Sequence, residues 1–194
     1  MICSPVETLA TRGRVVKNWD ATGPTDHFVQ FYRTDDYLIE CLASYVAAGI
    51  LAGERVLVIA TPDHRIALEK RLRVKSVDVA GMTAQSRYLA LDAEEVLAKF
   101  MVAGKPDPAL FQEVVGNIVR SASKEYRLRA FGEMVALLWS AGQSDAALAL
   151  EELWNDLARN HAFALYCAYP SECAAPAGLE RICRAHTHVI PQVG

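Results

Sequence analysis

Apolar runs of strand length alternate about five times with segments that begin on a helix-capping residue, and this alternation limits the folds open to the chain. The clearest run, 56–60, is apolar without a break, which is typical of a strand buried on both faces of a parallel sheet. Thr61 and Pro62 follow at once, a cap residue and a first-turn proline that begin a helix. Repeated strand–helix units predict right-handed crossovers and a sheet with helices on both faces. We therefore expect an α/β three-layer sandwich with a mostly parallel central sheet.

The same signals place the other elements. Short apolar or aromatic runs predict strands at 27–32, 55–60, 87–91, 127–133 and 163–169. Capping residues or a helical period predict helices that begin near residues 34, 61, 92, 107 and 144, a short one through 139, and one at 179–185. Residues 1–24 show no period and end at a Gly-Pro turn, so we expect an N-terminal arm followed by one domain over 25–194.

Composition narrows the class of protein. A chain of 194 residues with 52% hydrophobic and 22% charged residues is long and apolar enough to bury a real core. A net charge of −3 argues against a broad nucleic-acid-binding face. No apolar run approaches the roughly 18 residues that span a bilayer, and the first residues lack a signal-peptide pattern. Five cysteines, an odd number, favour reduced thiols, so we expect a cytoplasmic protein.

A ligand site is expected where the strands end, because open α/β sheets bind ligands beyond the carboxyl ends of their strands. The side chains that follow the five expected strands are Tyr32, Arg33, Thr34 and Asp35; Thr61, Asp63 and His64; Asp92; Glu133 and Met134; and Tyr169 and Pro170. This mixture suits a small-molecule pocket. Thr34, Asp35, Thr61 and Asp92 also have a purely structural interpretation, since the following helices need caps at these positions.

Two common catalytic designs are missing from the sequence. The turn after the first strand lacks the GxxxxGK[ST] pattern, contains no glycine and carries two acidic residues that would repel a triphosphate. No GxGxxG dinucleotide fingerprint and no GxSxG nucleophile elbow occurs elsewhere. These observations exclude nucleotide hydrolysis by a phosphate-binding loop and disfavour nucleophilic hydrolysis.

Several reactive side chains have a structural interpretation beside a functional one. Cys167 lies inside an apolar strand and is expected to be a small buried hydrophobe rather than a nucleophile. His27, at the amino end of the first strand, is expected to be structural and far from the pocket. Arg127, Arg129 and Glu133 share a strand, so a buried Arg–Glu pair either orients a ligand or holds two elements together.

The C-terminal part contains potential metal ligands. Cys183, His186 and His188 offer donor types that zinc prefers, but no paired CxxC accompanies them, so we expect no metal site and no cofactor. Glu151, Glu152 and Asn155 are expected on a solvated helix face with one residue turned inward.

Taken together, six segments of the chain resemble one known family. They are 27–32 (HFVQFY) with the acidic pair 35–36, 53–61 (GERVLVIAT), 89–93 (LALDA), 129–134 (RAFGEM), 150–155 (LEELWN) and 165–169 (LYCAY). Their order and spacing, from about residue 25 to 190, resemble the MEDS domains, the methanogen/methylotroph DcmR sensory domains. That family looks like a RecA/KaiC-type core that has lost its phosphate-binding loop, and it is thought to sense small organic molecules such as hydrocarbon derivatives.

The resemblance implies a non-catalytic sensory domain. Because 194 residues leave little room for an output region, we expect the signal to pass to a separate partner, such as a histidine kinase or a transcription regulator, with no direct contact to nucleic acid or membrane. The residues expected to line or brace the ligand site are Tyr32, Asp35, Thr61, His64, Arg129, Glu133 and Tyr169. Two alternatives remain: a protein-interaction or homodimerisation module with no small ligand, and a cysteine- or metal-dependent enzyme.

Overall fold

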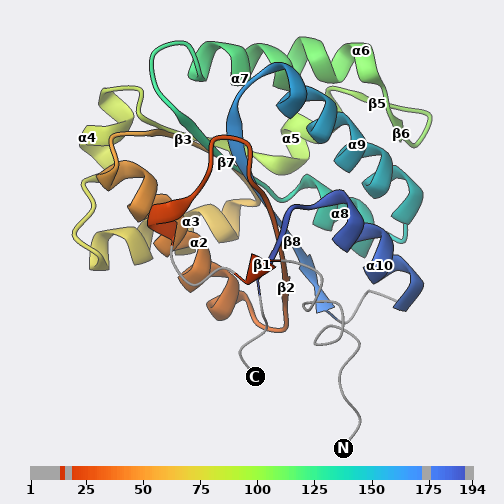
Figure 1. Ribbon diagram of the computed structural model, residues 1–194, viewed down its shortest axis with the longest axis horizontal. Coiled ribbons are helices and arrows are strands. Elements are labelled where there is room, and N and C mark those ends of the chain that lie inside the picture. Colours follow the sequence, from red (N-terminus) through yellow and green to blue (C-terminus); the bar gives the residue numbers. More distant parts are fainter. Residues whose placement is uncertain (1–13, 16–18, 172–175, 191–194) are drawn as a thin grey trace, which may run out of the picture.

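The computed structural model describes residues 14–15, 19–171 and 176–190 and is built around a seven-stranded sheet (Figure 1). The strand order is β1-β9-β2-β8-β7-β3-β4, and every neighbouring pair is parallel. The strands are β1 (Arg14–Val15), β2 (His27–Tyr32), β3 (Arg55–Ala60), β4 (Tyr88–Asp92), β7 (Leu128–Gly132), β8 (Phe163–Pro170) and β9 (His188–Ile190). A short antiparallel pair, β5 (Met101–Val102) and β6 (Lys105–Pro106), lies apart from this sheet.

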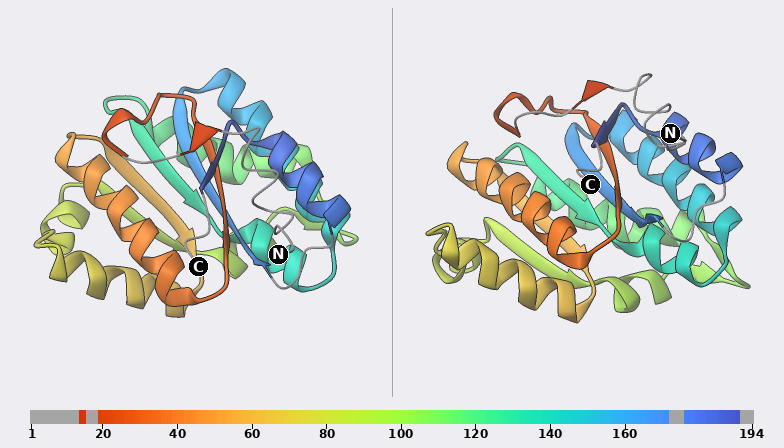
Figure 2. Two further views of the ribbon diagram at one scale, coloured as in Figure 1. Left: turned by 60° about the horizontal axis from the view of Figure 1, so that its bottom comes forward. Right: turned by 90° about the horizontal axis from the view of Figure 1, so that it is seen from below.

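Helices cover both faces of the sheet (Figure 2). On one face lie α2 (Asp35–Leu51), α3 (Pro62–Val74) and α4 (Val79–Ala84). On the other lie α5 (Ala93–Ala98), α6 (Pro108–Phe111), the π-helical turn η2 (Gln112–Gly116), α7 (Asn117–Ala122), α8 (Met134–Ser140), α9 (Ser144–Asn160) and α10 (Pro176–Ala185). The predicted α/β three-layer sandwich is confirmed.

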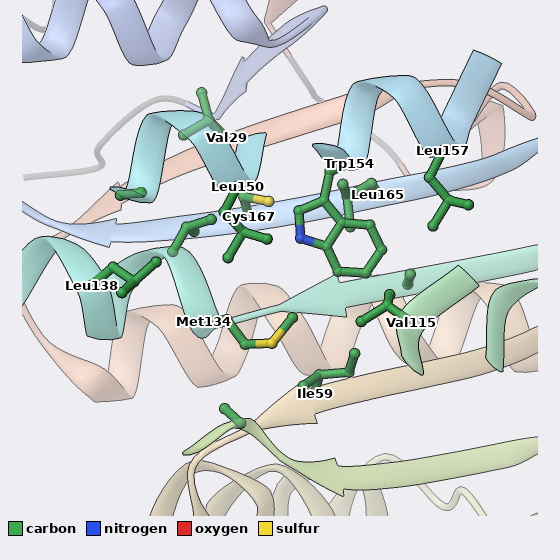
Figure 3. Packing of buried hydrophobic residues seen from close by; sticks show 14 of the residues in the cluster. Val29, Ile59, Val115, Met134, Leu138, Leu150, Trp154, Leu157, Leu165 and Cys167 are labelled. Carbon is green, nitrogen blue, oxygen red and sulfur yellow. The ribbon is translucent and has the colours of Figure 1, made fainter. Parts of the chain in front are cut away.

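Strand β3 shows why its sequence is apolar without a break. Val56 and Val58 belong to the core under α2 and α3, whereas Leu57 and Ile59 belong to the core on the opposite face. Since successive side chains point to opposite faces, a strand covered on both sides has no position for a polar residue. Figure 3 shows part of the second core, in which Ile59 lies near Met134.

The predicted strands agree closely with the structure, and the differences are at short elements. Strands β2 and β3 have the predicted bounds, and β4, β7 and β8 differ by one residue at one or both ends. Helix α4, the β5–β6 pair and strands β1 and β9 were not predicted. Strands β1 and β9 are two and three residues long, too short for a periodic pattern.

Part of the predicted arm packs on the domain. Trp19, in the short 3-10 helix η1 (Trp19–Ala21), contacts the rings of Phe28, Tyr45 and Tyr166, with centroids 5.2, 4.9 and 5.6 Å away. The boundary at residue 24 stays a prediction, but these contacts make Trp19 part of the core under α2. In the described part of the chain, no helix combines the length and the apolarity needed to cross a membrane.

Candidate functional site

A polar cluster at the carboxyl edge of the sheet is centred on Glu133. This residue directly follows β7, and its side chain is only 4% exposed. Its Oε2 accepts hydrogen bonds from the backbone N–H of Thr61 (2.8 Å) and from the Thr61 hydroxyl (3.3 Å). Because β3 and β7 are neighbours, the residues that follow them meet at the same place. Thr61 is the N-cap residue of α3, but its hydroxyl bonds to Glu133 rather than to the helix.

His64, in the first turn of α3, completes this cluster. Its Nδ1 lies 2.6 Å from Oε1 of Glu133, and its Nε2 lies 3.4 Å from Oδ1 of Asp35, the first residue of α2. The hydrogen bond to Glu133 raises the pKa of His64 above its ordinary value, against the opposing effect of burial. The cationic imidazolium is therefore favoured between two carboxylates.

A second ion pair lies along the same edge. Arg65 donates to Oδ2 of Asp92 at 2.9 Å, while Oδ1 of Asp92 accepts from the first backbone N–H groups of α5. Asp92 is thus both the helix cap that its sequence position suggested and the partner of a cation.

Four of the predicted site residues therefore meet at the predicted edge: Asp35, Thr61, His64 and Glu133. Within this group the Glu133 carboxylate and both ring nitrogens of His64 already have partners in the protein. Because these polar groups bond to one another, the cluster holds three chain segments together and leaves few free groups for a ligand.

Arg129 lies elsewhere, in a buried ion pair. Its Nε donates to Glu54, and its Nη1 donates to the carbonyl of Tyr45 at 3.3 Å, with the guanidinium 5.2 Å from the centre of the Tyr45 ring. The buried Arg–Glu pair considered from the sequence exists, but its acid is Glu54, before β3, and not Glu133. Arg127, more exposed, also contacts Glu54 at 3.3 Å.

The two predicted tyrosines are core residues. Tyr32 is 7% exposed and belongs to the core under α2 and α3. Tyr169 is fully buried on the opposite face, where its hydroxyl donates to Oε1 of Glu151 at 2.5 Å. Both rings are thus packed into the hydrophobic cores, on opposite faces of the sheet.

A second polar cluster is buried beneath α9, and its members are far apart in the sequence. It consists of His27 on β2, Glu151 on α9, Cys167 on β8 and His186 just after α10. We call these four residues the buried tetrad. His27 and Cys167 share a face because Val29 pairs with Cys167 and His27 lies two residues before Val29. Figure 3 shows Cys167 close to Val29 and Leu150.

The environment of the tetrad shifts its ionisation. Burial lowers the pKa of His27 to about 3 and raises the pKa of the Cys167 thiol. Burial also opposes ionisation of Glu151, but the contact with His186 and the hydrogen bond from Tyr169 outweigh it and lower the pKa of the carboxyl group to about 2. The tetrad thus holds an ionised carboxylate in the core.

Several residues near the tetrad differ from their sequence interpretation. His27 is buried, as a structural residue would be, but it contacts four polar side chains: Cys167, Glu151, Asn155 and His186. Glu151 is the inward residue of the helix face predicted to be solvated. Of Cys183, His186 and His188, the potential metal ligands for which no metal site was expected, His186 alone belongs to the tetrad.

A cavity of about 460 Å³ lies at the opposite end of the sheet, where β3 and β4 begin. Its lining residues are Arg55, Thr83, Ser86, Tyr88, Leu89, Asn117, Ile118, Ser121 and Ala122. Two of them, Arg55 and Tyr88, carry a buried atom, the Nε and the hydroxyl oxygen respectively, without a hydrogen-bond partner. The sequence did not indicate this place, because the ligand rule for α/β sheets directs attention to the carboxyl ends of the strands.

Comparison with known families identifies the chain's relatives. Residues 26–187 match the sequence model of the family described as MEDS, the methanogen/methylotroph DcmR sensory domain. The chain belongs to this family. The family resemblance predicted from the six segments is confirmed, and the protein has a sensory role. No curated protein matches the chain.

Proposed function

We propose that this MEDS domain binds a small organic molecule without transforming it and passes the signal to a separate partner, such as a histidine kinase or a transcription regulator. The observation that carries the proposal is the cavity at the amino ends of β3 and β4, with unpartnered polar atoms on two of its lining residues. A buried donor without an acceptor costs free energy, and an occupant that supplies the acceptor removes this cost. Both atoms are covered by their neighbours, so a ligand in the cavity engages them only after the lining side chains rearrange.

The lining indicates the chemistry of the ligand. Leu89, Ile118 and Ala122 supply apolar surface, while Arg55 and Tyr88 carry the covered N–H and O–H groups that a ligand would engage once the lining rearranges. A molecule with a short hydrocarbon body and one oxygen acceptor, such as an alcohol, aldehyde or ketone, satisfies both. This class agrees with the hydrocarbon derivatives that the family resemblance implied.

The two strands beside the cavity also lead to the polar cluster at the other edge. Strand β3 runs from Arg55 at the cavity to Ala60, directly before Thr61, and β4 runs from Tyr88 to Asp92. We infer that the His64–Glu133 cluster braces the far ends of these strands. A ligand that binds one arrangement of the strands more tightly than another shifts their populations, which is the physical content of sensing.

The proposal is tested by thermal-shift screening of short alcohols, aldehydes, ketones and halogenated alkanes, followed by calorimetry on the best compound. Tyr88→Phe removes the donor and keeps the ring, so we expect about tenfold weaker binding. Tyr126→Phe is the matched control, because Tyr126 contacts Arg55 and Arg87 through its ring, which the substitution keeps. The affinity of this variant for the compound should stay within twofold of wild type.

The outcomes separate the possible locations. If Tyr88→Phe binds normally and His64→Ala abolishes binding, the ligand lies at the carboxyl edge, where the sequence placed it. If no compound stabilises the domain, small-molecule sensing is rejected, and light scattering then tests the homodimer that the sequence left open.

A further inference from the structure

We propose that the buried tetrad is a binding site for a divalent transition-metal ion, with Zn²⁺ as the ion that its donors fit best. This inference goes beyond the small-molecule proposal and does not depend on it, since the tetrad lies on the opposite face of the sheet from α2 and α3 and does not include any residue that lines the cavity. It also departs from the expectation of no metal site that the sequence supports.

The distances among the donor atoms of His27, Glu151 and Cys167 fit a tetrahedral ion, and His186 joins them within 4.8 Å. The Nε2 of His27 lies 3.4 Å from Sγ of Cys167 and 3.5 Å from Oε2 of Glu151, and Sγ lies 3.7 Å from the same Oε2. The Nε2 of His186 lies 3.4 Å from Oε1 of Glu151, and one ligand atom from each residue falls within 4.8 Å of all the others. Tetrahedral zinc with bonds of about 2.0–2.3 Å separates its ligand atoms by about 3.3–3.8 Å.

Hydrogen bonds on the side of His27 away from the tetrad centre fix the tautomer of its ring. Asn155 donates from Nδ2 to the carbonyl of Ala185 at 3.0 Å, which turns its Oδ1 toward Nδ1 of His27, 3.0 Å away. An amide oxygen accepts, so Nδ1 carries the proton, and the lone pair lies on Nε2 at the centre of the tetrad. A histidine that ligates a metal ion is held in this way by a partner on its other nitrogen.

A hydrogen bond also fixes the tautomer of the His186 ring. Its Nδ1 lies 2.7 Å from the carbonyl of Ile182, which can only accept, so this nitrogen also carries the proton. Its Nε2 is buried and has no hydrogen-bond partner, although it is directed toward Glu151. In the metal-free protein this nitrogen faces the Glu151 carboxylate in an ion pair that requires a protonated ring, whereas a metal ion at the centre of the tetrad would take the lone pair of the neutral ring.

The types of ligand atom in the tetrad determine which metal ion it is expected to prefer. Two imidazole nitrogens, one thiolate and one carboxylate oxygen match the ligands that zinc takes in tetrahedral sites, whereas Ca²⁺ and Mg²⁺ require oxygen-rich sites. The hydrogen bond from Tyr169 to Oε1 of Glu151 leaves Oε2 for the ion. Binding releases the thiol proton of Cys167, and the two anionic ligands then balance the charge of a divalent ion.

Four protein ligands leave no open coordination position, which is typical of a structural site rather than a catalytic one. The ligands come from β2, α9, β8 and the residue that follows α10. An ion would therefore fasten the C-terminal helix to the sheet and stabilise the folded domain by mass action.

The direct experiment uses the wild-type chain of 194 residues. After removal of metal with a chelator and titration with Zn²⁺, we expect one tightly bound equivalent and a rise in melting temperature. The zinc-edge X-ray absorption spectrum should contain one sulfur and three nitrogen or oxygen scatterers. Less than about 0.2 equivalents bound at micromolar zinc, or a first shell without sulfur, would overturn the proposal.

Cobalt substitution assigns the ligands. The Co²⁺ complex of wild type should show a thiolate-to-metal charge-transfer band that is absent in Cys167→Ser and present in Cys183→Ser, because Cys183 is half-buried and outside the tetrad. His186→Gln should weaken zinc binding at least tenfold, and circular dichroism of each metal-free variant establishes that it is folded. If either substitution at the tetrad prevents folding, the wild-type absorption spectrum alone decides. An unchanged cobalt band in folded Cys167→Ser would refute the assignment.

Discussion

Nδ1 of His64 lies 2.6 Å from Oε1 of Glu133, and this contact joins the helix after β3 to the residue after β7. The acid is buried and the imidazole is largely so, which strengthens the bond relative to one in water. Since Glu133 also accepts from Thr61, a single carboxylate holds the carboxyl ends of two neighbouring strands and the first turn of α3.

Glu133→Gln should lower the pKa of His64 toward its ordinary value of 6.5, because the hydrogen bond to the carboxylate is the main cause of the upward shift. The folded-state pKa of His64 lies above the unfolded value, so this bond stabilises the fold fully below pH 6.5 and its contribution is lost as the pH rises through the folded pKa. We expect the variant to lose about 1.5–3 kcal/mol at pH 5.5 and less at pH 9. NMR titration and urea unfolding at both values measure these effects.

Asp35→Asn is the control for that experiment. Asp35 is 73% exposed and lies 3.4 Å from Nε2 of His64, so its removal should lower the pKa of His64 less than Glu133→Gln does. An equal or larger effect from Asp35→Asn would contradict the view that Glu133 dominates.

Arg129→Met should destabilise the fold by about 3–5 kcal/mol, because it leaves the carboxylate of Glu54 buried without its main partner. Arg129→Met combined with Glu54→Leu should recover most of this loss, since a buried ion pair and an apolar pair of similar volume differ little in stability. Urea unfolding of the two single variants and the double variant forms a double-mutant cycle.

Arg127→Ala tests whether burial is the cause. Arg127 contacts the same carboxylate, but its side chain is 54% exposed, so its removal should cost no more than about 1 kcal/mol. If Arg127→Ala cost as much as Arg129→Met, the strength of the pair could not be attributed to burial.

Gly49→Ala should also destabilise, although alanine is usually the better helix residue by about 1 kcal/mol. A Cβ at position 49 of α2 would lie 2.7 Å from Cδ of Arg129, whose guanidinium is fixed by Glu54. We expect a net loss of about 1–3 kcal/mol from this overlap in thermal or urea unfolding. Gly116→Ala is the comparison, because its new Cβ meets chiefly the end of the flexible Gln112 side chain. A stabilised Gly49→Ala would show that Arg129 moves freely.

The sequence predicted the sheet well because each strand carries its own signal. The unbroken apolar run in β3 requires cover on both faces, and Thr61 and Asp92 sit where parallel strands turn into helices. The same rule places Thr61, His64 and Glu133 at the carboxyl edge, although their direct contact also requires β3 and β7 to be neighbours.

The features that the sequence did not predict depend on strand order and on contacts between distant segments. Arg129 pairs with Glu54 because β7 lies beside β3, an order that no local pattern contains. The buried tetrad joins residues 27, 151, 167 and 186, which become neighbours only through the pairing of β2 with β8 and the packing of α9 and α10. The inward position of Glu151 had one available sign: it lies four residues before Asn155 on the helix, so the two side chains share a face.

Trp19→Ala should destabilise the domain by about 2 kcal/mol, although residue 19 precedes both the predicted domain start at 25 and the family match at 26. The indole contacts Phe28, Tyr45 and Tyr166, so its removal exposes aromatic core under α2. Urea unfolding monitored by far-UV circular dichroism, a signal that does not depend on the missing tryptophan, measures the change. Leu51→Ala, at a position that is 85% exposed, is the control, and its free energy of unfolding should stay within about 0.5 kcal/mol of wild type. A Trp19→Ala protein as stable as wild type would place the start of the cooperative unit after residue 19, as the sequence pattern alone suggested.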